Sequence, residues 1–125
     1  MNVAGKLGRM LGSAHRIETS RPRRHVRVSA GGQILAESDQ AVLLREGRLP
    51  ERWYLPREDV HAELLDSDTH TTCPFKGEAS YHSLRLSDGE VLEDAVWYYP
   101  EPLPAVSEIA GRLSFYGERV EIEVD

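Results

Sequence analysis

Short segments of alternating apolar and polar residues, separated by turns that contain Gly or Pro, run from residue 26 to the end of the chain. The segment HVRVSA alternates at Val26 and Val28, and the closing segment RVEIEVD alternates throughout. A period of two gives an extended strand one apolar face, whereas a helix requires a period of about 3.6 residues. We therefore expect a mainly β fold of antiparallel strands.

Glycine-containing dipeptides between these segments predict hairpins. Gly31-Gly32 precedes QILAES, and Asp88-Gly89 lies between Leu86 and Val91. Such dipeptides favour the tight turns that join antiparallel strands. Lys76-Gly77 lies between HTTCPF and ASYHSLRL and is expected to form a sharp turn there. Further strands are expected at QAVLLREG, LPERWYLP and VLEDAVWYY.

Two segments have apolar residues at helical spacing and predict short helices. Residues 57–65 follow Pro56 and carry acids in their first turn, both of which favour a helix start. Residues 102–116 place four apolar residues on one helical face: Val106, Ile109, Ala110 and Leu113. The sequence thus predicts one or two short helices beside the strands.

The composition suits one domain with a core. The chain has 125 residues, of which 40% are hydrophobic and 29% charged. No apolar run reaches the ~18 residues of a membrane helix, and the first residues lack the apolar core of a secretory signal. The single cysteine, Cys73, excludes a disulfide within the chain. We expect a cytoplasmic protein without a membrane span.

Charge divides the chain into a basic start and an acidic body. Six cations and one acid in residues 1–25 give +5, which leaves −11 on the rest of a chain of net charge −6. An acidic body repels phosphate backbones, so we expect no binding to duplex nucleic acid. We expect residues 1–22 to be a flexible basic tail and residues 23–125 to be a single domain.

Cys73 and Lys76 are the candidate catalytic residues. A reactive thiol requires a nearby cation or helix N-terminus, and Lys76 could be that cation. In an extended strand the two residues would lie ~10 Å apart, so only a turn brings them close. The alternative is a buried structural cysteine that shapes the turn, which is the more common situation for a free cysteine.

The sequence favours no metal site. His70-x-x-Cys73 has ligand-like spacing, but a structural zinc site requires four ligands and no second pair exists. Asp66-Ser67-Asp68 resembles a carboxylate pair for Mg²⁺, but no phosphate-binding glycine loop precedes it. A turn is the simpler interpretation of this acidic segment. We predict no metal and no cofactor.

Aromatic residues predict a pocket wall. Trp97 and Tyr99 must lie on one face of their strand and Tyr98 on the other. One face would pack in the core, and a concave face would form an amphipathic pocket. The residues expected to bind a ligand are Tyr54, Lys76, Tyr81 and Trp97, with core packing as the alternative for each ring.

Four strings carry a resemblance to a known family: WYLPREDV, TTCPFKGEASY, EDAVWYYPEPLP and IAGRLSFYGERVEI. From about Arg23 to Val124 the chain resembles a bacterial and fungal family, domain of unknown function 427, whose members often carry a nucleotidyltransferase label. The resemblance implies a β-tent-like fold of two antiparallel sheets with a cleft between them. Zinc-binding relatives of this fold use paired C-x-x-C motifs, which are absent here.

Three functions follow as hypotheses. The first is binding of a small polar or anionic molecule in an aromatic cleft, with Lys76 as its cation. The second is an enzyme of the same cleft, dependent on Cys73 or acting as a nucleotidyltransferase. The third is a protein-interaction module. The sequence does not decide whether the chain is an enzyme, nor its oligomeric state.

Overall fold

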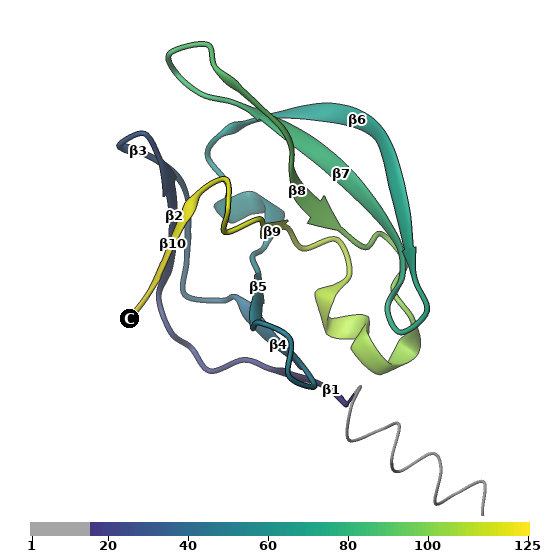
Figure 1. The fold of residues 1–125 in the computed structure, drawn as a ribbon. Coiled ribbons are helices and arrows are strands. Elements are labelled where there is room, and N and C mark those ends of the chain that lie inside the picture. Colours follow the sequence, from purple (N-terminus) through teal and green to yellow (C-terminus); the bar gives the residue numbers. More distant parts are fainter. Residues whose placement is uncertain (1–15) are drawn as a thin grey trace, which may run out of the picture.

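The computed structural model describes residues 16–125, which form three antiparallel sheets (Figure 1). The expected mainly β fold is confirmed, with three sheets in place of two. One sheet contains β1 (Ile17–Ser20), β4 (Val42–Glu46) and β5 (Arg52–Tyr54). A second contains β10 (Glu121–Val124), β2 (Val26–Ala30) and β3 (Gln33–Ser38). The four-stranded sheet contains β6 (Glu63–Cys73), β7 (Gly77–Arg85), β8 (Val91–Tyr98) and β9 (Ser114–Phe115).

The predicted hairpins are present. Gly31 and Gly32 join β2 to β3 with φ of 56° and 80°, and Gly89 joins β7 to β8 with φ of 92°. These angles lie in the left-handed region, which residues with a Cβ rarely adopt. The glycines therefore supply the turn geometry that the alternating segments require.

The helix predicted over residues 57–65 is wrong beyond its first turn. Only η1, a 3₁₀ helix at Arg57–Asp59, forms after Pro56. Leu64 and Leu65 instead belong to β6, where they pair with Leu84 and Ser83 of β7. Nine residues cannot sustain a helix on propensity alone, so pairing with a long neighbouring strand determines the outcome.

The second predicted helix is shorter than expected. The 3₁₀ helix η2 spans Pro104–Ile109 and buries Val106 and Ile109. Leu113 is also buried, but in extended chain, where it exchanges two 2.8 Å backbone hydrogen bonds with Leu55. These bonds connect the β1-β4-β5 sheet to the four-stranded sheet beside β9. Within the described residues, no helix could span a bilayer.

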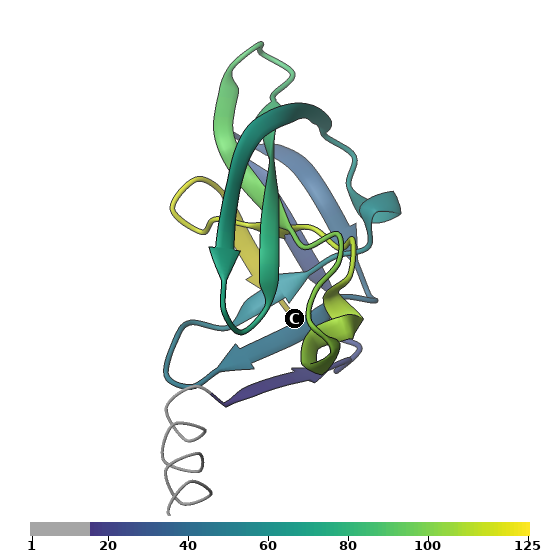
Figure 2. The same cartoon turned by 90° about the vertical axis from the view of Figure 1, so that its right-hand side faces the viewer.

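Residues 17–20, which the sequence analysis placed in the tail, form an edge strand. β1 pairs with β4 from Ile17 opposite Glu46 to Ser20 opposite Leu43. Thr19 Oγ1 donates a 2.6 Å hydrogen bond to Glu108 of η2, and Arg21 Nε donates one of 3.0 Å to the same carboxylate. Figure 2 shows β1, in purple, alongside β4. The body thus begins before the expected residue 23, and residues 1–15 of the expected tail lie outside the described residues.

Two hydrophobic clusters lie on opposite faces of the four-stranded sheet. The first packs that sheet against β2 and β3, with Val26, Leu35, Leu84 and Val96 fully buried. The second lies between the four-stranded sheet, β4, β5 and η2. Its buried members are Val42, Leu44, Tyr54, Ala79, Tyr81, Trp97, Tyr99, Val106 and Ile109. The second cluster is unusually rich in aromatic rings and borders the candidate site.

Candidate functional site

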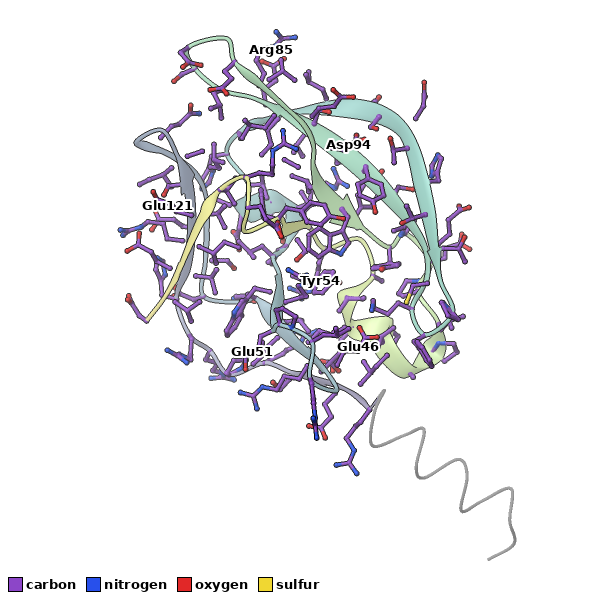
Figure 3. The ribbon with its side chains drawn as sticks, viewed as in Figure 1. Glu46, Glu51, Tyr54, Arg85, Asp94 and Glu121 are labelled. Atoms are coloured by element: carbon purple, nitrogen blue, oxygen red, sulfur yellow. The ribbon has the colours of Figure 1, made fainter. Side chains whose placement is uncertain are left out.

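One cavity, here called the Tyr–Trp cavity, opens beside the second cluster. It has a volume of about 200 Å³. All four residues predicted to bind a ligand, Tyr54, Lys76, Tyr81 and Trp97, line it, and six others complete the lining: Glu46, Leu49, Pro50, Arg52, Tyr99 and Tyr116. Glu46 and Tyr54 lie inside the molecule, whereas Arg85 and Glu121 lie at its edge (Figure 3). The fold therefore brings together residues from distant parts of the sequence.

Strand alternation on β4 and β5 supplies one wall. Val42, Leu44 and Glu46 share the inner face of β4, so Glu46 extends an apolar row with a carboxylate. On β5, Arg52 lies opposite Leu44 and Tyr54 opposite Val42, which places both on that same face. Glu46 and Arg52 are thus charged side chains on strand faces that otherwise build the core.

The four-stranded sheet supplies the opposite wall. Tyr81 of β7 pairs directly with Trp97 of β8, so both rings point to the same face. Tyr99 follows on that face, as predicted. Tyr98 lies on the other face, where its ring stacks on His82 at a centroid distance of 4.8 Å. The predicted division of Trp97 and Tyr99 from Tyr98 is confirmed.

Trp97 is held by contacts on several sides. Its Nε1 donates a 3.1 Å hydrogen bond to the Tyr54 hydroxyl, and the two rings meet edge to face at 6.2 Å. The Tyr116 ring lies 4.4 Å from it, and the Arg52 guanidinium carbon lies 5.3 Å from its centroid. This arrangement fixes the indole in one orientation, as a preorganised wall requires.

The hydroxyls of Tyr54, Tyr99 and Tyr116 remain neutral at the cavity. Burial raises the pKa of Tyr54 to about 12, and burial also raises the pKa values of Tyr99 and Tyr116. The Tyr81 hydroxyl lies 2.9 Å from Thr71 Oγ1 and 3.5 Å from the Tyr116 hydroxyl. Neutral phenols both donate and accept hydrogen bonds, so this wall can contact polar groups of either kind.

Lys76 lies in the lining but is not a free cation. Its ammonium contacts Glu46 Oε1, and the two side chains are only 11% and 10% exposed. Glu46 was not predicted as a site residue, although its place in the Val42–Leu44 row marks it as an acid on an inward face. The charge expected to meet an anionic ligand is therefore already balanced by the protein.

The turn that carries Lys76 has the predicted sharp geometry. The Lys76 N–H donates a 3.2 Å bond to the Cys73 carbonyl, and Gly77 has φ of 112°. The Leu103 N–H donates a 2.9 Å bond to the Lys76 carbonyl. The lysine backbone is thus fixed from both sides, which aims its side chain at Glu46.

Cys73 ends β6 and is partly buried against the second cluster. It is not among the residues that line the Tyr–Trp cavity. The turn brings its backbone to Lys76, but the Lys76 ammonium pairs with Glu46. This geometry fits the role of a packing residue, and catalysis by the thiol stays a prediction that no contact supports.

The acidic Asp66-Ser67-Asp68 segment forms a bulge of β6. The register with β7 shifts between Asp66 and His70, and the Ser67 hydroxyl donates a 2.5 Å bond to Asp94. Asp66 is exposed, and His70 contacts Ser80 at 3.2 Å. Across residues 16–125, no group of three or more His, Cys, Asp or Glu side chains is placed to hold a metal.

A larger hollow lies elsewhere on the surface. Its volume is about 430 Å³, and its lining is Arg21, Arg23, Asp39, Gln40 and Ala41. Only Ala41 of these five is buried, so the polar groups of this hollow face solvent. A binding site requires a few fixed polar groups among apolar walls, and the smaller Tyr–Trp cavity meets that requirement better.

Comparison with known proteins places the chain in a family but adds no activity. No curated protein matches the chain. One family model matches residues 17–125 and bears the short name NTP_transf_9, in line with the label expected for members. The match starts at β1 and covers the described body almost completely. The chain therefore belongs to the family described as Domain of unknown function (DUF427).

Proposed function

We propose that this protein binds a small polar molecule in the Tyr–Trp cavity. The observation that carries the proposal is the convergence of Tyr54, Lys76, Tyr81 and Trp97 on one hollow. Aromatic walls with a few oriented hydroxyl, ammonium and carboxylate groups are the usual composition of a small-ligand site. We further propose a cytoplasmic setting, because a chain with one cysteine forms no internal disulfide.

The size of the cavity limits the ligand. Sites for drug-sized molecules usually have volumes of roughly 300–1,000 Å³, and this one has about 200 Å³. A single ring or a short chain with polar ends fits such a volume. A nucleoside triphosphate would lie largely outside it, so the cavity gives no support to nucleotidyl transfer.

The rival hypotheses have weaker support. Thiol-dependent catalysis requires Cys73 at the reacting atoms, and Cys73 is absent from the lining. A protein-interaction module would be favoured by a contiguous flat apolar patch. Large apolar residues are exposed on separate elements, including Ile34 on β3, Phe75 after β6 and Ile122 on β10.

A thermal-shift screen of small polar molecules tests the proposal. Nucleotides with and without Mg²⁺ should be included, because a ligand that binds the native state raises its melting temperature. The cavity variant is Glu46→Gln with Lys76→Met, which removes both charges of the pair together. The matched control is Arg45→Gln with Glu51→Gln, an exposed 2.8 Å pair on the neighbouring strand ends.

We expect at least one small molecule to stabilise the wild type and the control but not the cavity variant. A screen without any stabilising compound would contradict the proposal. Equal stabilisation of all three proteins would show that binding takes place elsewhere on the molecule.

A further inference from the structure

The charges around the Tyr–Trp cavity do not cancel. Its lining contains two cations, Lys76 and Arg52, and one carboxylate, Glu46. Glu46 pairs with Lys76. Within the part of the chain that the structure describes, the Arg52 guanidinium forms no ion pair and instead lies over the Trp97 ring. One positive charge at the cavity is thus left without a carboxylate.

Nearby acids do not compensate Arg52. Glu51, the residue before β5, is exposed and contacts the exposed Arg45 at 2.8 Å. Glu118 lies close enough to influence Tyr116, but it is exposed and outside the lining. An ion in solvent is screened, whereas a partly buried charge in the lining of a cavity acts more strongly on a bound group.

The position of Arg52 suits recognition of a carboxylate. A guanidinium presents a planar fork of N–H groups that matches two carboxylate oxygens, and stacking on an aromatic ring leaves those N–H groups available at its edge. Arg52 is partly buried, and its guanidinium carbon lies 5.3 Å from the Trp97 centroid. This contact with Trp97 therefore restrains the guanidinium before any ligand arrives.

We infer that the Tyr–Trp cavity is selective for a small monocarboxylate with a flat apolar body, and that Arg52 binds its carboxylate. The body packs among Trp97, Tyr81 and Tyr116, and the phenol hydroxyls and the Lys76–Glu46 pair face its polar substituents. The one uncompensated cation matches a ligand with one negative charge. A polyanion such as a nucleotide would carry more negative charge than this cation can balance. This inference rests on the proposed function and names the ligand class of the same site.

Three probes of similar size and different charge test the inference. Benzoate is the monoanion, benzamide is its neutral counterpart, and benzyltrimethylammonium is the cation. Binding of each to the full chain is measured by isothermal titration calorimetry at low ionic strength. We expect benzoate to bind about tenfold more tightly than benzamide, since a charged hydrogen bond contributes that much, and the cation to bind least.

The variant Arg52→Gln should abolish the preference for benzoate over benzamide while benzamide binding remains. Arg45→Gln is the matched control, because Arg45 lies on β4, next to β5, and faces outward to Glu51. Circular dichroism of both variants checks folding. If Arg52→Gln does not fold, Arg52→Lys takes its place, with a reduced preference expected because an ammonium lacks the planar fork.

The outcomes separate this inference from the proposed function. Equal binding of benzoate and benzamide, a preference for the cation, or a benzoate preference that survives Arg52→Gln would overturn the carboxylate assignment alone. Failure of all three probes at millimolar concentration would also overturn it. The proposed function would be overturned as well only if the thermal-shift screen found no ligand whose binding depends on the Glu46–Lys76 pair.

Discussion

At the scale of single residues, the Lys76–Glu46 pair has the largest energetic consequence. Both side chains are almost buried, so removal of either partner leaves an uncompensated charge in a poorly solvated place. We expect Lys76→Met to lower the free energy of unfolding by about 3 kcal/mol. The double variant with Glu46→Gln should lose clearly less, because no lone charge remains. Urea denaturation of the wild type, the two single variants and the double variant measures this, and a double-variant loss equal to the sum of the single losses would show that the pair is not coupled.

Gly77 has a conformation that side chains rarely adopt. Its φ is 112°, and an added Cβ would lie 3.4 Å from the Glu101 carbonyl oxygen and 3.6 Å from Pro102 Cα. We expect Gly77→Val to cost more than ~1 kcal/mol of stability, through backbone strain and crowding. Gly117→Val is the control, since no heavy atom lies within 4 Å of its Cβ position and its φ is ordinary. Equal losses in urea denaturation would refute the strain argument.

His82 predicts a dependence of stability on pH. Burial lowers its pKa, while its ring contacts the Leu65 carbonyl at 3.2 Å and Arg57 at 3.1 Å. The folded-state pKa lies below the unfolded value of about 6.5. The histidine therefore contributes stability above that value, and the contribution is lost as the pH falls toward the folded pKa, because the unfolded chain takes up the proton first.

The test compares wild type with His82→Phe, which keeps a ring for stacking on Tyr98. We expect the difference in unfolding free energy between the two to shrink from about pH 7 to about pH 5. His25 acts in the opposite direction, because contacts with Glu37 and Asp39 raise its pKa, but it is present in both proteins. A constant difference across this range would mean that His82 does not titrate differently in the two states.

At the scale of elements, local signals explain which predictions succeeded. Gly31-Gly32 and Asp88-Gly89 determine their turns within a few residues, so the hairpins follow from sequence. Leu64 and Leu65 have helical spacing, but pairing with β7 is a long-range effect that local spacing cannot reveal. β1 contains one apolar residue, Ile17, and its pairing with β4 leaves no pattern in residues 17–20.

The residues of the candidate site likewise divide into those that the sequence reveals and those that only the folded structure reveals. Tyr54, Tyr81, Trp97 and Lys76 stand out by type and were predicted, whereas Tyr99 and Tyr116, which also line the cavity, were not predicted to bind a ligand. Glu46 and Arg52 are common residues on ordinary strands, and their role depends on how the β1-β4-β5 sheet folds against the four-stranded sheet. Only the three-dimensional arrangement brings Arg52 over Trp97, so no local pattern could have identified it as a site residue.

β1 has a testable role as an edge element. It pairs with four residues of β4, the strand that carries Glu46, and it contacts η2 through Glu108. We expect a chain that begins at residue 23 to melt several degrees below one that begins at residue 16, because β4 loses its ladder partner on one side. Thermal melts of the two truncated proteins measure this, and similar melting temperatures would show that β1 adds little.

At the scale of the whole molecule, the two hydrophobic clusters share structural elements and should unfold together. The four-stranded sheet contributes Leu84 and Val96 to the first cluster and Tyr81 and Trp97 to the second. β5 likewise packs Trp53 against the first cluster and buries Tyr54 in the second. Neither cluster can open without exposing strands that the other requires, which is the condition for a cooperative transition.

The two tryptophans report on the two clusters separately. Trp97→Phe leaves Trp53 as the fluorophore beside the first cluster, and Trp53→Phe leaves Trp97 in the second. Within each variant, we expect the urea midpoint from fluorescence to coincide with that from circular dichroism, although the variants differ in stability. If the fluorescence of Trp97 changes at lower urea than the circular dichroism, the second cluster opens alone. The Tyr–Trp cavity would then belong to a less stable part of the fold, and ligand binding would raise the fluorescence midpoint selectively.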